Sequence, residues 1–398
     1  MENKTKYIQE LSEYIYENVS KISYGITNIN SIYRFYTSFA MSKAEYSTLT
    51  VKEAIEIQKK EIDKINDHYF NDIKDEINQL SIYEKNYQKQ LQALHDKLEY
   101  YNIANTIKYI SESNIAEIIK KNGLDDGVLL DLHYRLTIGL DELFYWKLNG
   151  YDPYFSWKFR TKNNIKVWTK LVLDHNLIKE HLDNIKWLSK NISSLSDIFY
   201  LHARLYYCHA FSNGNKRICR VLEEIYIVNL WIEPSLSASH WYYLQQDRYI
   251  SQIYLKTIRK PLFHTFEDLG YSSLILSALY ILHNELSSIK KKILKDYDIT
   301  ILKGFHEWER FKTKDLEITY TKKLKIWERA FFKILDKEKE LLWNIITENK
   351  VWRNVYYSLD IQDEKYKEIK SKIQELLGIY SEYNYNYNEI GFLKNYKF

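Results

Sequence analysis

The sequence predicts a mainly α-helical protein, on two observations. Glycine and proline, the residues that most often interrupt helices, number only 10 and 3 among 398 residues. Apolar residues recur at helical spacing through long charged stretches, as between Lys52 and Asn102, which predicts amphipathic helices with one solvated face. The chain is 45% hydrophobic and 28% charged, as ordinary globular proteins are, so these helices can bury a core.

The order of these stretches predicts three regions. Residues 1–120 form a helical N-terminal region, which ends at a glycine-containing break from Lys120 to Gly127. Residues 121–290 form a central domain of amphipathic helices, and residues 291–398 form a helical C-terminal region rich in tryptophan and tyrosine. The run from Ile165 to Leu173 is rich in β-branched and aromatic residues, and it predicts a short β-hairpin.

The charge balance and the cysteines argue against several classes of function. The 57 basic and 53 acidic residues give a net charge of +4, too balanced to indicate a nucleic-acid-binding protein. Cys208 and Cys219 have neither metal-ligand spacing nor a disulfide framework. The sequence predicts no signal peptide and no membrane span. We therefore expect a cytoplasmic protein; delivery into a host cell and homo-oligomer formation stay open.

Two predicted helices joined by a short polar loop are the most informative part of the central domain. Ser196 and Asp197 predict the cap of a helix that runs to Cys208, and a second helix begins near Ile218 after the break FSNGN. His209 lies at the end of the first helix. The start of the second helix presents unpaired backbone N–H groups and a partial positive charge, which suit a phosphate group.

The side chains of this loop are those that phosphate chemistry needs. Gly214 allows the backbone to approach a ligand closely, and the asparagines on either side of it offer amide groups to a phosphate or a metal. Arg217 and Arg220, three residues apart, can clamp phosphate oxygens. His209 can take a proton from a hydroxyl nucleophile. The pattern predicts phosphoryl or nucleotidyl transfer.

The loop from His209 to Arg220 reads HAFSNGNKRICR, which resembles the motif HPFxDGNGRxxR of the Fic/Doc family. The matching positions are His209, Phe211, Gly214, Asn215, Arg217 and Arg220. The resemblance covers roughly residues 120–290 and implies a Fic-type helical bundle core with a short β-hairpin flap, plus helical N- and C-terminal extensions. The flap, with Ile165 and Val167, would hold a segment of the target protein as an added strand.

The resemblance also implies ATP as the donor and a serine, threonine or tyrosine hydroxyl of a target protein as the acceptor. His209 would be the general base, and Phe211 would anchor the loop in the core. The residues implied to hold the phosphates are Gly214, Asn215 and Lys216 through the loop backbone, Arg217 at the β/γ region and Arg220 at the γ-phosphate.

Two positions depart from the family pattern. Asn213 replaces the acidic residue that holds Mg²⁺, and an uncharged amide predicts a weakened magnesium site. Lys216 replaces the second glycine of the motif. The Doc branch of the family also has Asn-Lys-Arg at this point and is thought to transfer the terminal phosphate. Lys216 therefore favours a kinase, whereas Gly214 and Arg220 match the nucleotidyl-transfer pattern.

A weaker resemblance lies upstream, in the segment Met41–Thr50, MSKAEYSTLT. It is similar to the family's inhibitory helix, and it implies that Glu45 pairs with Arg220 and displaces the γ-phosphate. Met41 and Tyr46 depart from the inhibitory pattern, and an ordinary solvated helix glutamate is the alternative for Glu45.

These observations leave three functions in order of preference. The first is a protein nucleotidyltransferase that moves AMP from ATP to a target protein, and the second is a Doc-like protein kinase. The third is a catalytically degenerate Fic-fold binding module, which the missing acidic residue at Asn213 motivates. Removal of AMP and the use of other donors also stay open, as do purely structural roles for His209, Lys216 and the two arginines.

Overall fold

The described part of the chain is mostly helical, which confirms the mainly α fold class. It divides into two compact units, Met1–Tyr16 with Tyr24–Ser277 and Glu17–Ser23 with Ala278–Phe398. The computed structural model describes residues 2–19, 69–144, 147–148, 158–163, 166–167, 170–233, 236–254, 265–295, 297, 311–312, 328–342, 346–351, 354–359 and 361–383.

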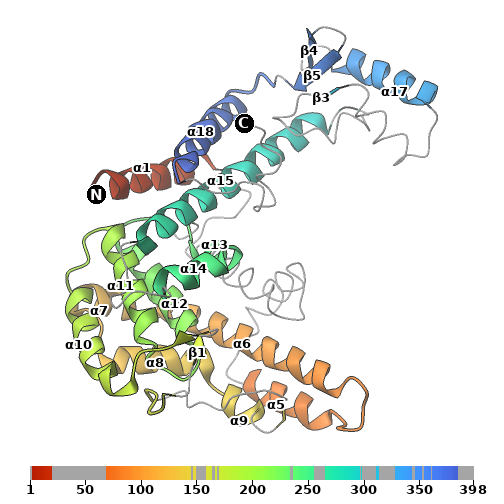
Figure 1. The fold of residues 1–398 in the computed structure, drawn as a ribbon. Coiled ribbons are helices and arrows are strands. Elements are labelled where there is room, and N and C mark those ends of the chain that lie inside the picture. Colours follow the sequence, from red (N-terminus) through yellow and green to blue (C-terminus); the bar gives the residue numbers. More distant parts are fainter. Residues whose placement is uncertain are drawn as a thin grey trace. The chain divides into compact units, whose positions relative to one another are not determined.

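The first unit is a bundle of helices with a small hairpin (Figure 1). Two of its helices, α1 and α15, continue into the second unit. Its helices are α1 (Glu2–Asn18), α5 (Tyr69–Gln79), α6 (Tyr87–Glu112), α7 (Ile115–Asn122), α8 (Asp126–Thr137), α9 (Leu140–Phe144), α10 (Ile178–Ser189), α11 (Leu195–Cys208), α12 (Asn215–Asn229), α13 (Ser239–Leu244), α14 (Gln246–Ile253), α15 (Thr265–Leu294) and the 3₁₀ helix η2 (His175–Leu177).

Helices α11 and α12 pack against each other at the centre of this unit. Helices α7 and α8 pack on α12, while α10 and α14 pack on α11. Apolar side chains at helical spacing form the shared core, so the bundle buries the faces that the sequence pattern predicted. Buried members of this core include Leu129, Leu132 and Leu136 of α8, Phe199, Ala203 and Tyr206 of α11, and Val221, Leu222 and Ile227 of α12.

Helix α11 begins with a capping box. The Ser194 hydroxyl accepts a hydrogen bond from the backbone N–H of Asp197, and the Asp197 carboxylate accepts one from the backbone N–H of Ser194. The sequence placed the cap at Ser196 and Asp197; Asp197 does take part, but the N-cap residue is Ser194, two residues before Ser196. The Ser196 hydroxyl instead donates to Glu267 of α15 at 2.8 Å.

Helix α1 belongs to the core of the first unit through polar contacts with distant segments. Gln9 Nε2 donates to the carbonyl of Leu230 at 2.9 Å, and the backbone N–H of Glu233 donates to Ser12 Oγ at 2.6 Å. The region boundaries expected from the sequence fall inside helices, the first within α7 and the second within α15. Neither boundary therefore coincides with a break between helices.

A short antiparallel hairpin joins β1 (Lys166–Val167) to β2 (Lys170–Leu171). Lys166 pairs with Leu171, and Val167, which is half-buried, pairs with Lys170. The hairpin lies in the run that the sequence identified as strand-like. Ile165 lies outside the described residues, and so does the segment with Glu45.

The second unit combines helices with a small sheet. Its elements include β3 (Phe311–Lys312), α17 (Glu328–Leu341), β4 (Ile346–Val351), β5 (Asn354–Leu359) and α18 (Glu364–Ser381). The antiparallel strands have the order β3-β5-β4. The sequence predicted only helices here, and the sheet corrects that expectation. Its strand β5, NVYYSL, has the β-branched and aromatic content that favours strands.

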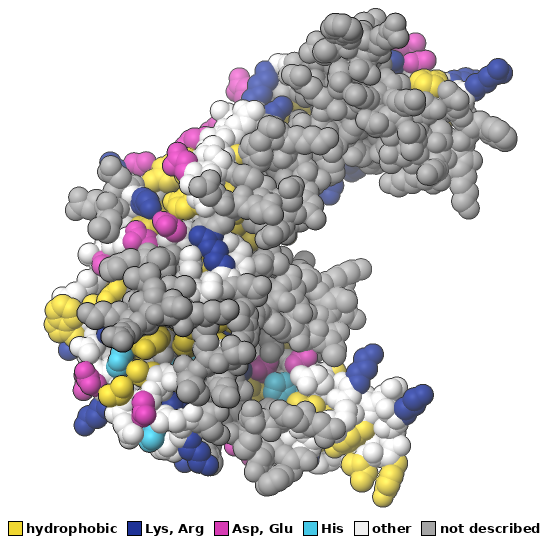
Figure 2. Space-filling model, viewed as in Figure 1, with side chains coloured by type: hydrophobic (Ala, Val, Ile, Leu, Met, Phe, Trp, Pro, Cys, Tyr) yellow, Lys and Arg dark blue, Asp and Glu magenta, His cyan; other side chains and the backbone are white. Residues whose placement is uncertain are grey.

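The surface carries both signs of charge. On the face that Figure 2 shows, basic and acidic side chains are interspersed among the described residues, in keeping with the small net charge. Among the helices that the structure describes, none is both long and apolar enough to cross a membrane.

Gly139, between α8 and α9, provides a test of the packing of the first unit. Its φ is +76°, and a Cβ there would lie 2.1 Å from Cε2 of Phe70. We expect Gly139→Ala to lower the free energy of unfolding by about 2 kcal/mol or more, through backbone strain and overpacking. The control is Gly378→Ala in α18, where a Cβ meets nothing within 4 Å and helix propensity should add about 0.5–1 kcal/mol of stability. Unchanged urea unfolding of Gly139→Ala would contradict this packing.

Candidate active site

His209 closes helix α11 in a left-handed backbone conformation. Its φ and ψ are 47° and 52°, and its backbone N–H donates to the carbonyl of Leu205 at 3.3 Å. A left-handed conformation costs a residue with a side chain about 1–2 kcal/mol. The imidazole is buried, with the residue only 7% exposed. The chain thus reverses direction at His209 while the ring stays inside the protein.

The buried guanidinium of Arg160 holds the backbone of this reversal. Arg160 Nε donates to the carbonyl of His209 at 2.6 Å, and its backbone N–H donates to the carbonyl of Ala210 at 2.9 Å. Its other two nitrogens donate to the carbonyls of Lys162, at 3.0 Å, and Leu173. Arg160 therefore ties the loop after α11 to both segments that flank the hairpin.

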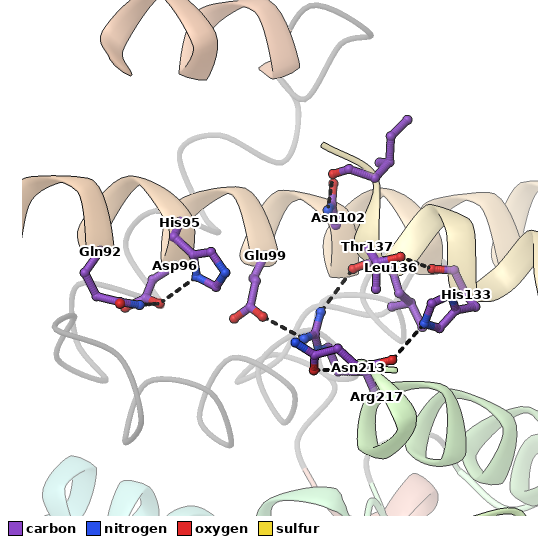
Figure 3. A network of polar contacts seen from close by, with 12 residues as sticks. Gln92, His95, Asp96, Glu99, Asn102, His133, Leu136, Thr137, Asn213 and Arg217 are labelled. Atoms are coloured by element: carbon purple, nitrogen blue, oxygen red, sulfur yellow. Dashed lines mark hydrogen bonds and ion pairs between the residues drawn. The ribbon is translucent and has the colours of Figure 1, made fainter. Parts of the chain in front are cut away.

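Phe211 is buried and stacks on His133 of α8. The ring centroids are 3.7 Å apart and the planes differ by 3°. His133 Nε2 lies 2.9 Å from the carbonyl of Asn213, and since a carbonyl only accepts, this nitrogen is the donor (Figure 3). His133 thus contacts the loop twice, by stacking on Phe211 and by a hydrogen bond to the backbone of Asn213.

The side chain of Asn215 closes the loop upon itself. Its Oδ1 accepts from the backbone N–H of Phe211 at 3.0 Å, and its Nδ2 donates to the carbonyl of Phe211 at 2.7 Å. The exposed Asn213 accepts a hydrogen bond from the backbone N–H of Gly214 at 2.7 Å through its own Oδ1. The two amides that the sequence assigned to a phosphate or a metal therefore also shape the loop.

Helix α12 begins directly after Gly214, which has a φ of +77°. A Cβ on Gly214 would lie 3.0 Å from both His133 Nε2 and Thr137 Cγ2, so a larger residue would strain this turn. The first turn of α12 includes the cations Lys216 and Arg217. Their charge adds to the positive end of the helix dipole and makes this helix start favourable for an anion.

The two arginines of α12 contact different neighbours. Arg217 Nη2 lies 2.8 Å from Oε1 of the buried Glu99 on α6, and its Nη1 lies 3.3 Å from the carbonyl of Leu136 on α8 (Figure 3). Arg220 is buried and lies over the ring of Tyr249, 5.9 Å from its centroid. The helix start therefore has one guanidinium toward α6 and one toward α14.

His209 is neutral over a wide pH range. Burial lowers its pKa to about 3, and the positive charges of Arg160 and Lys216 act in the same direction, while the backbone carbonyl of Tyr206 opposes them. A neutral imidazole has one unprotonated nitrogen, which can accept a proton from a substrate.

The model of the Fic/DOC family matches residues 124–227. These residues form a Fic domain. The match runs from the turn before α8 through most of α12, and it includes the loop from His209 to Arg220. A comparison with curated proteins found no match.

The Fic domain holds its loop with residues that the sequence motif did not single out. Arg160 and His133 lie 49 and 80 residues before their loop partners. Glu99 and Tyr254 contact the loop or its neighbours from outside the matched segment. A local pattern cannot identify such contacts, although both Arg160 and His133 lie within the matched segment.

The described loop of the Fic domain offers few ligand atoms to a magnesium ion. Asn213 Oδ1 is neutral and already accepts a hydrogen bond from Gly214, so it fits Mg²⁺ weakly. On α6, ligand atoms of His95, Asp96 and Glu99 lie within 4.8 Å of one another. His95 Nδ1 contacts Asp96 Oδ1 at 3.4 Å and Glu99 binds Arg217, so this cluster forms a polar network with protein partners (Figure 3).

The lowered pKa of His209 predicts a pH dependence of stability. Unfolded histidine titrates near pH 6.5, so between about pH 6.5 and 3 the unfolded state binds the extra proton. The free energy of unfolding should then fall as the pH is lowered, by about 2 kcal/mol from this residue between pH 7.5 and 5. Urea unfolding at both pH values should show a shallower dependence in His209→Gln than in the wild type. Equal slopes in the two proteins would contradict the lowered pKa.

Proposed function

We propose that this protein is a protein nucleotidyltransferase that transfers AMP from ATP to a serine, threonine or tyrosine hydroxyl of a target protein. The proposal depends on one observation. A buried, neutral His209 and the positive start of α12 lie at the two ends of one short loop. The match to the Fic/DOC family supports a transferase of this type. Nucleotidyl transfer ranks first because Gly214 and Arg220 follow that branch of the motif.

In the proposed reaction, His209 accepts the proton of the target hydroxyl as the oxygen attacks the α-phosphorus of ATP. A new bond forms between that oxygen and the α-phosphorus, and the bond to the bridging oxygen of the β-phosphate breaks. The bridging oxygen keeps the electron pair, and pyrophosphate leaves. Positioning and charge neutralisation supply most of the catalysis in such transfers.

The positive groups around the loop would bind the triphosphate. The backbone N–H groups at the start of α12, Lys216 and Arg217 provide positive potential, and Arg220 would reach the γ-phosphate. The bound phosphates would offset the cations that lower the pKa of His209, so nucleotide binding should raise that pKa and strengthen the base. When Mg²⁺ is bound it would add charge neutralisation of the phosphates, with Asn213 as a weak protein ligand.

Labelled ATP tests the proposal directly. Incubation of the wild-type protein with α-labelled ATP and a cell lysate should place label on protein, and His209→Ala should lower the transfer rate by at least about 100-fold. The control is His181→Ala, which changes a half-buried histidine on α10 outside the loop and should keep the wild-type rate. Label that comes only from γ-labelled ATP would reject AMP transfer. Absence of label from both donors would reject both proposed transfers.

A Doc-like protein kinase is the second candidate, and Lys216 is the observation that favours it. This side chain is half-buried, and its charge is close enough to His209 to lower the pKa of the imidazole. A cation there could bind phosphates in the orientation that exposes the terminal phosphorus. The hydroxyl oxygen would then attack the γ-phosphorus, and ADP would leave.

The variant Lys216→Gly separates the two candidates. If Lys216 sets the orientation of the nucleotide, the wild type should label protein from γ-labelled ATP, and Lys216→Gly should shift the label toward the α-labelled donor by about 10-fold or more. A matched variant, Lys186→Gly on α10, keeps the loop unchanged. An unchanged ratio of the two labels in Lys216→Gly removes the argument for the kinase.

A further inference from the structure

The ring of His209 has a hydrogen-bond partner that no motif indicated. His209 Nδ1 lies 3.1 Å from the hydroxyl oxygen of Tyr254, the residue that caps the C-terminal end of α14. The same hydroxyl donates to the backbone carbonyl of Tyr206 at 2.7 Å. His209 is 7% exposed and Tyr254 is 5% exposed, so the contacts are shielded from water. Tyr206, Tyr254 and His209 therefore form one buried hydrogen-bonded group.

A count of protons gives the direction of each bond in this group. A phenol has one proton, and a backbone carbonyl can only accept. The proton of Tyr254 therefore lies toward the carbonyl of Tyr206, at the shorter of the two distances. The phenol oxygen is then an acceptor toward His209, and the proton between these two residues must belong to Nδ1.

The surroundings of the ring favour the same arrangement. The carbonyl of Tyr206 stabilises a protonated ring nitrogen, since it acts to raise the pKa of His209 against the effect of burial. A buried neutral imidazole has one N–H only, and a proton on Nδ1 leaves the lone pair on Nε2. The backbone of His209 is held on both sides, by Leu205 at its N–H and by Arg160 at its carbonyl. These two contacts fix the backbone from which the ring projects.

We propose that Tyr254 is a positioning residue that keeps the proton of His209 on Nδ1, so that Nε2 is free to accept the proton of the target hydroxyl. This inference rests on the proposed function for the role of Nε2, while the position of the proton rests on the contacts alone. Tyr254 lies 45 residues after His209 and outside the matched segment 124–227. It acts through His209 and not on the substrate.

The tautomer is measured by nitrogen NMR of the full chain labelled with ¹⁵N, near pH 7.5. In the wild type, the His209 signals should show a protonated Nδ1 and an unprotonated Nε2. In Tyr254→Phe, the ring loses the phenol oxygen as an acceptor for Nδ1, and a large fraction of His209 should move its proton to Nε2. Assignment comes from the signals that disappear in His209→Gln.

Tyr226→Phe is the matched control. The Tyr226 hydroxyl is also buried and also donates to a carbonyl at the end of a helix, that of Ser189 at 3.3 Å, so its partner is on α10 and not in the histidine loop. Its removal costs a similar hydrogen bond and should leave the His209 tautomer unchanged. A loss of stability common to both variants is thereby separated from an effect on the ring.

Kinetics supply the second measurement. If a wrong tautomer removes the general base, kcat for AMP transfer should fall by about 100-fold in Tyr254→Phe, while KM for ATP stays within about 2-fold and Tyr226→Phe resembles the wild type. A wild-type His209 with its proton on Nε2 would overturn the proposal without any variant. So would an unchanged tautomer in Tyr254→Phe. A wild-type protein that has the expected tautomer but transfers no AMP would instead reject the proposed function.

Discussion

The candidate site depends on the contact between Arg160 and the carbonyl of His209. A left-handed residue with a side chain costs about 1–2 kcal/mol, and a hydrogen bond to a charged group contributes about 1.5–3 kcal/mol. One such bond is therefore enough to offset the strain of His209, and Arg160 also donates to two other carbonyls. The same guanidinium joins the histidine loop to the flanks of the hairpin. A shift of the hairpin would therefore move the group that binds the carbonyl of His209.

The charges around the loop favour a neutral His209 and a positive start of α12. Arg160 and Lys216 lower the pKa of His209, and burial lowers it further. Glu99 offsets the charge of Arg217. Burial raises the pKa of Glu224 to about 8, which limits the negative charge near Arg220. A buried ion pair contributes little net stability compared with apolar packing, but its loss leaves an uncompensated charge. Glu99 therefore orients Arg217 more than it stabilises the fold.

The sequence could predict the local parts of this site and not the distant ones. Helix spacing, the break at Gly214 and the position of His209 at a helix end follow from residues close together in the chain, and the structure has all three. Arg160 and Tyr254 contact His209 but lie 49 and 45 residues from it in the sequence. Single polar residues form no periodic pattern from which such contacts could be predicted. The C-terminal sheet escaped prediction for a similar reason, because strand pairing is also set by distant partners.

The contacts of the candidate site extend beyond the segment that matches the Fic/DOC family model. The matched segment, residues 124–227, contains His209, Arg217 and Arg220. It also contains His133 and Arg160, which donate hydrogen bonds to the loop. The ion-pair partner of Arg217 comes from α6, before that segment, and the partner of the His209 ring comes from the end of α14, after it. Helices on both sides therefore supply the partners of Arg217 and of the His209 ring. Differences in these outer helices could change the chemistry of a Fic loop without any change in its motif.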